Sequence, residues 1–139
     1  MSNDTPATGL NLRSLVTDDG QLKLLLKSSP VPEPGPDEVV VRVEATPINP
    51  SDQATLIMPE DVTTGETTGS GADTVYAAKI RSGMEARLKP RVGKPLPAGN
   101  EGAGTVVKAG SSDAAQALLG KTVAVFDGAL YCQYRKVNV

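Results

Sequence analysis

The chain has 139 residues and a net charge of −2, with acidic and basic residues mixed along its length. This length suits one domain with its own core, and the mixed charge argues against a nucleic-acid or membrane partner, which usually requires a concentrated basic stripe. The absence of histidine and the single cysteine, Cys132, exclude Ser-His-Asp and Cys-His catalysis and leave no imidazole and thiolate set for zinc.

The sequence also lacks a signal-like apolar segment at its N-terminus, an apolar run long enough to cross a bilayer, and a second cysteine for an intrachain disulfide. We therefore expect a soluble protein in a reducing, cytoplasmic compartment. The 14 glycines and 11 prolines, beside one phenylalanine and no tryptophan, favour a β-rich fold with many turns over a helical bundle.

The first third of the chain predicts three strands. Residues 10–16 and 21–27 are apolar-rich runs separated by a turn that ends in Gly20, which predicts a hairpin. Four prolines in residues 28–37 predict an extended connector. Residues 38–45 then alternate as a half-buried strand does. The predicted inward face carries Val39, Val41, Val43 and Ala45.

The last third predicts further strands at residues 102–109, 121–126 and 130–137, and a short helix at residues 111–119. Asp113 is the expected N-cap of this helix, and Gly120 is its expected C-terminal stop. Short strands at this spacing, with turns rich in proline and glycine, predict a mainly β fold. We expect a twisted, partly open β-barrel with one or two short helices.

Residues 53–96 are predicted to be an inserted region of loop and helix. Residues 61–71 are rich in threonine, glycine and serine, so we expect them to be mobile. Residues 73–88 predict an amphipathic helix, because Tyr76, Ile80, Met84 and Leu88 recur every four residues, although Gly83 opposes it. Two interpretations stay open: the apolar stripe packs on the barrel, or the insertion covers a substrate pocket as a lid.

Two polar segments that each adjoin a predicted strand carry the strongest signal. They are Ala45-Thr46-Pro47-Ile48-Asn49-Pro50-Ser51-Asp52 and Pro97-Ala98-Gly99-Asn100-Glu101-Gly102-Ala103-Gly104. Together they resemble the two loops that frame the active-site cleft of the medium-chain dehydrogenase/reductase superfamily. In its zinc alcohol dehydrogenases, a cysteine stands at the place of Asn49 and a histidine at the place of Asn100.

Because both of these positions hold amides, the resemblance implies the zinc-independent, quinone oxidoreductase-like branch. Its members reduce quinones or activated double bonds with NADPH. The fold it implies is their N-terminal GroES-like domain, on the substrate side of the cleft, spanning residues 1–139. The Rossmann domain that binds the NADPH pyrophosphate is not represented, since no strand, glycine-rich turn and helix follow one another here. We therefore expect an N-terminal piece of a longer enzyme or a truncated relative, inactive by itself.

The resemblance also assigns site residues. Asn49, Asp52 and Asn100 are expected on the cofactor side, with Asn49 beside the nicotinamide and Asp52 fixing its loop. Ser51 is a catalytic candidate, because its hydroxyl can donate toward a substrate oxygen. Tyr76 is the second, since related enoyl reductases use a tyrosine from this region as a proton donor. Simpler interpretations stay open: residues 47–52 suit any tight turn, and Tyr76 suits a core or surface position.

The neighbours of Asn100 have structural interpretations. Glu101 matches the family pattern and is expected to support its loop. Gly102 and Gly104 precede a β-favouring Thr-Val-Val run, so they predict close backbone packing in a strand and not a dinucleotide fingerprint. Cys132 is expected to be a small packing residue.

The expected partner is a small quinone or enone substrate, with neither nucleic acid nor membrane. The resemblance implies that the full-length protein pairs as a homodimer through its cofactor domain, whereas this piece alone is expected to be monomeric. The alternative is a stand-alone GroES-like β-barrel that binds or interacts without catalysis. The natural substrate does not follow from the sequence.

Overall fold

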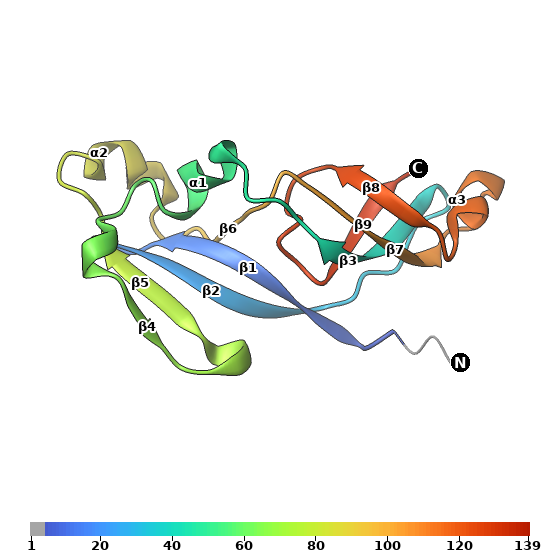
Figure 1. Cartoon of the computed structure of the whole chain (residues 1–139), viewed down its shortest axis with the longest axis horizontal. Helices are drawn as coiled ribbons and strands as arrows, with labels where there is room; N and C mark the ends of the chain where they lie inside the picture. The colour runs from blue at the N-terminus through green and yellow to red at the C-terminus, as the bar shows by residue number, and fades with distance from the viewer. Residues whose placement is uncertain (1–4) are drawn as a thin grey trace. The chain divides into compact units, whose positions relative to one another are not determined.

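The computed structural model describes residues 5–139, which divide into two compact units. Unit 1 comprises residues 5–11, Ser28–Pro47 and Gly99–Val139, and unit 2 comprises Leu12–Lys27 and Ile48–Ala98. Each unit is built around one sheet, one of five strands and one of four (Figure 1).

The five-stranded sheet has the order β4-β5-β2-β1-β6. Strands β1 (Thr8–Val16) and β2 (Gln21–Pro30) confirm the predicted hairpin, and each is longer than expected. Gly20 closes the turn between them with φ of +81°, a conformation that glycine adopts without steric cost. The connector after β2 is shorter than predicted, because Pro30 still belongs to the strand as its last residue.

The predicted helix over residues 73–88 is wrong. Residues Val75–Lys79 form strand β5, which pairs antiparallel with β2, Leu24 lying opposite Tyr76. Only Glu85–Leu88 is helical (α2), after Gly83 has turned the chain with φ of +88°. Pairing with a distant strand therefore overrides the four-residue apolar spacing, since β propensity and packing depend on tertiary context.

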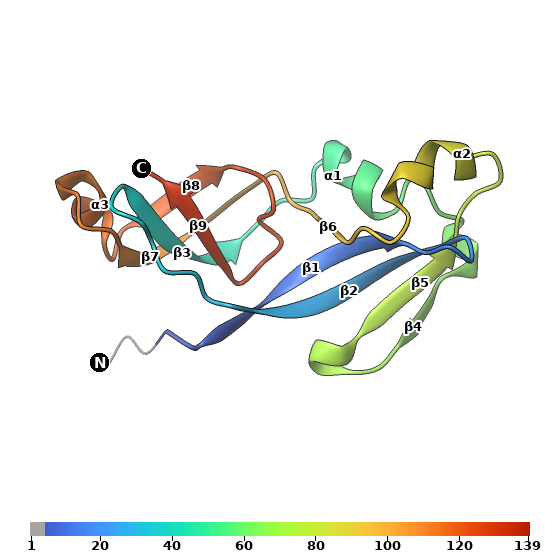
Figure 2. The same cartoon turned by 180° about the vertical axis from the view of Figure 1, so that it is seen from behind.

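The stretch expected to be mobile is organised as a hairpin arm, which Figure 2 shows from behind. Strand β4 (Glu66–Thr68) pairs antiparallel with β5 and forms one edge of the sheet. The other short elements of unit 2 are α1 (Pro50–Leu56), the 3-10 turns η1 (Val62–Thr64), η2 (Gly71–Asp73) and η3 (Lys89–Arg91), and β6 (Leu96–Pro97).

The four-stranded sheet of unit 1 has the order β8-β7-β3-β9. Its strands are β3 (Glu38–Ala45), β7 (Glu101–Ala109), β8 (Thr122–Phe126) and β9 (Tyr134–Asn138), with α3 (Asp113–Leu118) between β7 and β8 (Figure 1). The predicted bounds of β3 are confirmed, and those of β7 and β8 differ by one residue. β9 begins four residues later than expected and leaves Cys132 in the preceding loop.

Aliphatic side chains form the core of unit 1. Its buried members are Val39, Val41, Val106, Ala115, Val125 and Leu130. Each valine contributes roughly 1.5–3 kcal/mol by leaving water. The predicted inward face of β3 is correct for Val39, Val41 and Val43, but Ala45 is exposed. A register shift between Val43 and Ala45 interrupts the alternation there.

Helix α3 confirms the predicted short helix with a different cap. Ser112 is the N-cap, and its hydroxyl accepts a hydrogen bond from the N–H of Ala115, whereas Asp113 is the first helical residue. Gly120 follows the helix with φ of +76°. Residues 5–139 contain three short α-helices, one more than the upper expectation. The predicted mainly β class, with two open sheets and few short helices, is confirmed.

Candidate active site

The two predicted polar segments are the first cleft loop (residues 45–52) and the second cleft loop (residues 97–104). Parts of both lie side by side within unit 1, because β3 and β7 are neighbours. Ala45 at the end of β3 pairs with Ala103 near the start of β7. A Cβ atom on Gly102 would lie 2.8 Å from Cγ2 of Thr46, and one on Gly104 would collide with the backbone carbonyl of Arg42. These glycines therefore allow close approach of two strands, as the sequence predicts.

Tyr131 joins the same two loops. Its hydroxyl donates a hydrogen bond of 2.9 Å to the carbonyl of Pro47 in the first loop. Its backbone and ring pack on Gly99 in the second loop, where an added Cβ would lie 2.6 Å from the Tyr131 nitrogen. Gly99 has φ of +93°, so both its backbone and its surroundings require glycine. Tyr131 thus holds the beginnings of both loops in unit 1.

Asn100 and Glu101 follow directly in the second loop. The carbonyl of Asn100 accepts a hydrogen bond of 3.3 Å from the N–H of Gly128. Glu101 is the first residue of β7 and pairs with Phe126 of β8. Both residues are half-buried. The backbone of this loop is therefore fixed by the sheet, and the cofactor role of the Asn100 side chain stays a prediction.

In unit 2, the predicted polar turn is the start of helix α1. Asn49 is its N-cap, and the N–H of Asn49 donates a hydrogen bond of 2.9 Å to Oδ2 of Asp52. Pro50 occupies the first turn, where its missing N–H costs nothing. Asp52 is 3% exposed. This arrangement is a capping box, so Asp52 fixes the backbone of Asn49, and its predicted contact with a cofactor stays a prediction.

Ser51 lies beside these residues in the first turn of α1 and is exposed. Asn49, Ser51 and Asp52 are therefore brought together by one helix start. The exposure of Ser51 is compatible with contact to a bound molecule. The catalytic role of Ser51 stays a prediction.

A buried polar network anchors the other half of α1. The hydroxyl of Ser14 in β1 donates to the carbonyl of Thr55 at 2.6 Å, and the guanidinium of Arg91 donates to the Ser14 oxygen at 3.0 Å. Ser14 is 0% exposed. Burial lowers the pKa of Arg91 from its usual value. Sequence reasoning missed this network, because a serine in a strand and an arginine in a basic loop carry no recognisable spacing.

Tyr76 lies on β5, away in sequence from the α1 residues but in the same unit. Its hydroxyl packs on Gly65, where an added Cβ would collide with it. Burial, and next the neighbouring Glu60, raise the pKa of Tyr76 above its usual value. A phenol held protonated against other protein groups favours the packing interpretation, and its role as proton donor stays a prediction.

The Glu60 side chain is the second feature that the sequence did not indicate. It is 0% exposed, and burial raises its pKa, against smaller lowering effects of Tyr76 and Arg81. In the sequence it is one carboxylate among 16 acidic residues, at no motif spacing. Only the folded structure shows that this carboxyl is covered.

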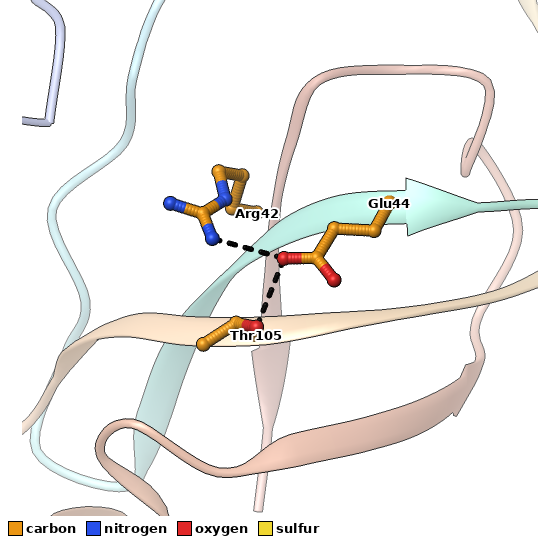
Figure 3. A network of polar contacts seen from close by, with 3 residues as sticks. All are labelled: Arg42, Glu44 and Thr105. Carbon is orange, nitrogen blue, oxygen red and sulfur yellow. Dashed lines mark hydrogen bonds and ion pairs between the residues drawn. The ribbon is translucent and has the colours of Figure 1, made fainter.

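The surface of unit 1 carries a separate polar cluster on β3 and β7. Arg42 donates to Oε1 of Glu44 at 2.9 Å, and the Thr105 hydroxyl donates to the same oxygen at 2.9 Å (Figure 3). Arg42, and next Thr105, lower the pKa of Glu44. Arg42 and Glu44 are exposed, so this cluster is a solvated ion pair of little energetic weight.

Residues 5–139 contain neither a metal-binding cluster nor a membrane-spanning helix. No group of three or more His, Cys, Asp or Glu side chains within them could hold a metal ion. None of the helices in this range has the length and apolar character needed to span a membrane. The glycines of β7 do not fit a pyrophosphate cradle, because neighbouring protein atoms occupy the space beside both of them.

Comparison with known proteins places these features in a family. Residues 35–138 match the family model described as the alcohol dehydrogenase GroES-like domain. This range includes both cleft loops, the whole four-stranded sheet, and β4, β5 and β6 of the five-stranded sheet, whereas β1 and β2 precede it. No curated protein matches the chain.

Among solved structures, the chain is similar to a protein of Mesorhizobium loti that is assigned as an NADPH:quinone reductase. The two share 24% sequence identity with a TM-score of 0.55, over 96% of this chain. At this identity the likeness shows the fold alone. The chain spans about a third of that protein, since the match covers 35% of its length.

Proposed function

Because the chain belongs to the alcohol dehydrogenase GroES-like domain family, we propose that it is the substrate-side part of an NADPH-dependent, zinc-independent oxidoreductase. The substrates are quinones or activated double bonds. The full-length protein is cytoplasmic and pairs as a homodimer through its cofactor domain. This chain alone is inactive.

The observation that carries the proposal is the identity of residues 49 and 100. Both are asparagines in loops that resemble the zinc-ligand loops of alcohol dehydrogenases, and the chain contains no histidine. Amides donate and accept hydrogen bonds but are poor replacements for imidazole and thiolate on zinc. The similarity in fold to a protein assigned as an NADPH:quinone reductase supports the same branch.

The proposed chemistry uses donors in place of a metal. Reduction of a quinone or enone places negative charge on a substrate oxygen, and hydrogen-bond donors aimed at that oxygen stabilise it. Ser51 is the first candidate for this contact, because it is exposed beside Asn49. Loss of one well-aimed donor of this kind costs on the order of 3 kcal/mol of barrier. Tyr76 is the second catalytic candidate, as a proton donor to the substrate.

Asn49 and Asn100 are proposed to lie on the cofactor side, with Asp52 holding the Asn49 backbone. The residues described here provide no strand, glycine-rich turn and helix for the pyrophosphate. NADPH is therefore proposed to depend on a further domain, in line with the greater length of the similar protein. Residues 53–96 are proposed as an insertion that shapes the substrate pocket.

The test is NADPH oxidation by the protein that contains this chain and any sequence its gene encodes after Val139. A panel of quinones and enones is supplied, with and without a strong zinc chelator. We expect turnover of at least one acceptor that the chelator does not reduce. Turnover that is abolished by the chelator and restored by zinc would contradict zinc independence.

A protein without turnover on any acceptor would contradict the reductase proposal. If the same protein binds quinones or enones without NADPH oxidation, it is a GroES-like binding module. Titration of the acceptor followed by intrinsic tyrosine fluorescence distinguishes these two results. Within residues 1–139 this signal comes from three tyrosines, since this part contains no tryptophan.

A further inference from the structure

Glu60 is the most deeply covered charged residue in the described part of the chain. It is 0% exposed, and neither carboxyl oxygen has a hydrogen-bond partner of acceptable geometry among residues 5–139. Its backbone is firmly held: its N–H donates to the Ile57 carbonyl at 3.2 Å, and its carbonyl accepts from Nε of Arg81 at 2.7 Å. Because the residue is fully buried, its carboxyl reaches water only when the groups that cover it move.

Strand β5 of the β4–β5 hairpin and the residues directly after it lie against Glu60. Glu60 forms an isolated antiparallel bridge with Ile80, directly after β5. Tyr76 of β5 is a close neighbour of the carboxyl, and its ring packs on Gly65, where an added Cβ would lie 2.7 Å from Cε2. We call Glu60, Gly65, Tyr76 and Arg81 the Glu60 cluster.

The charges around Glu60 do not compensate for its burial. Tyr76 and Arg81 are the groups that lower its pKa, yet burial is the larger effect and the pKa is raised. The Arg81 Nε already donates to a carbonyl. The other charged groups near this point are Asp61 and Lys79, and the N–H of Asp61 is bonded to the Lys79 carbonyl at 2.8 Å. A buried carboxylate with so little compensation is costly, so burial shifts the balance toward the neutral acid.

We propose that the Glu60 cluster is a pH-responsive latch, in which neutral Glu60 holds the β4–β5 hairpin closed over the segment after α1 and ionised Glu60 releases it. The released state exposes Glu60 to water, breaks the packing of Tyr76 on Gly65 and loosens residues 61–74. Tyr76 belongs to both proposals, but this inference does not rest on the oxidoreductase proposal, since its evidence is the internal packing of unit 2.

The sign of the pH effect follows from linkage. A carboxyl with a raised pKa in the folded state favours folding fully below the ordinary glutamate value of 4.5. Above that value the unfolded chain loses its proton first, so stability falls with rising pH until the folded carboxyl also ionises. The latch is therefore closed under acidic conditions and opens toward alkaline pH.

The experiment compares the wild-type chain with Glu60→Gln by urea unfolding between about pH 4 and about pH 9. In this interval the unfolding constant of the wild type is expected to rise relative to that of Glu60→Gln. The rise is about tenfold per pH unit until the folded carboxyl ionises. Glu66→Gln, which removes an exposed carboxyl on β4, is the matched control and should follow the wild type.

Hydrogen exchange distinguishes a local latch from a general loss of stability. Amides of residues 61–74 should exchange faster in the wild type as pH rises, after correction for intrinsic rates, while those of β3 and β7 stay protected. Glu60→Gln should abolish this local change. Parallel unfolding curves for the wild type and Glu60→Gln at every pH would overturn the proposal.

A direct titration keeps the test valid if Glu60→Gln does not fold. The carboxyl carbon of Glu60 can be followed by NMR in the wild-type chain, with Glu60→Met as an alternative variant for assignment. A midpoint above 4.5 that coincides with the loss of protection in residues 61–74 is the expected result. A midpoint at or below 4.5 would show that Glu60 is ionised in the folded protein and that the latch does not exist.

Discussion

Tyr131 donates a hydrogen bond of 2.9 Å from its hydroxyl to the backbone carbonyl of Pro47. The donor belongs to the segment before β9, and the acceptor belongs to the first cleft loop. Because the ring of Tyr131 also packs on Gly99, this bond connects the two loops that carry the candidate residues. The placement of Pro47 and Gly99 relative to each other in unit 1 therefore depends on a residue outside both loops.

Removal of this hydroxyl is the first prediction. Tyr131→Phe keeps the ring on Gly99 but removes the donor, and a hydrogen bond of this kind contributes about 0.5–1.5 kcal/mol to stability. We expect a loss within that range in urea unfolding. Tyr134→Phe, on β9, is the comparison. Equal stabilities of Tyr131→Phe and the wild type would mean that water replaces the bond without cost.

The close approach of β3 and β7 gives the second prediction. In Gly104→Ala, the new methyl group meets the carbonyl of Arg42, and the strands must separate to admit it. Overpacking of this kind costs about 1–3 kcal/mol, measured as the shift in unfolding free energy. Gly128→Asn is the control, since Gly128 has open space around its Cα and a positive φ that asparagine tolerates. A Gly104→Ala protein as stable as the wild type would disprove the packing argument.

The elements that the sequence predicted well are those with strong local signals. The alternation in β3 and the turn at Gly20 depend on the period of a strand and on the freedom of glycine, and both are visible within ten residues. The closeness of Gly104 to β3 was also accessible, because glycine before a β-favouring run indicates backbone packing. These signals describe the chain locally and need no knowledge of partners.

The elements that the sequence failed to predict depend on distant partners. β5 has the apolar spacing of a helix, yet it pairs with β2 about 50 residues earlier in the chain. Residues 130–133 alternate like a strand, but Tyr131 is directed to Pro47 and β9 starts only at Tyr134. The burial of Glu60 has no local signal at all, since it arises where the segment after α1 meets the end of β5.

The sequence predicted the candidate site only in part, because some of its contacts come from distant parts of the chain. The sequence places Asn49, Ser51 and Asp52 in one polar segment, and the structure gathers them at the start of α1. The sequence analysis predicted a turn here and not a helix, although Asn49, Pro50 and Asp52 are together a helix N-terminus signal. The contributions of Ser14 and Arg91, which hold the other half of α1, come from separate parts of the chain and could not be anticipated.

The third prediction concerns acid stability in unit 1. The ion pair with Lys136, at 2.8 Å, and next the Gly35 N–H, lower the pKa of Glu38 from 4.5. A lowered pKa stabilises the fold above pH 4.5, and this contribution disappears as pH falls through the lowered value. Glu38→Gln should therefore reduce Tm at about pH 7 and change it less at about pH 3. A difference in Tm that grows on acidification would contradict this assignment.

The fourth prediction separates the structural and chemical roles at the start of α1. Asp52→Ala removes the acceptor of the Asn49 N–H, and loss of such a cap costs about 1 kcal/mol of stability. Ser51→Ala changes an exposed side chain and should alter stability by no more than about 0.5 kcal/mol.

In the full-length protein, Ser51→Ala should lower kcat more than Asp52→Ala does, which is the reverse of their order for stability. Ser51→Ala is expected to lower kcat by about 100-fold if its hydroxyl stabilises the substrate oxygen, since such donors contribute about 10²-fold or more. Asp52→Asn retains an acceptor oxygen for the Asn49 N–H, so it should preserve most of the stability and serves as the matched variant for Asp52→Ala. A Ser51→Ala enzyme with unchanged kcat would remove Ser51 from the catalytic groups and leave the helix start with a purely structural role, because the cap itself is already complete without the hydroxyl.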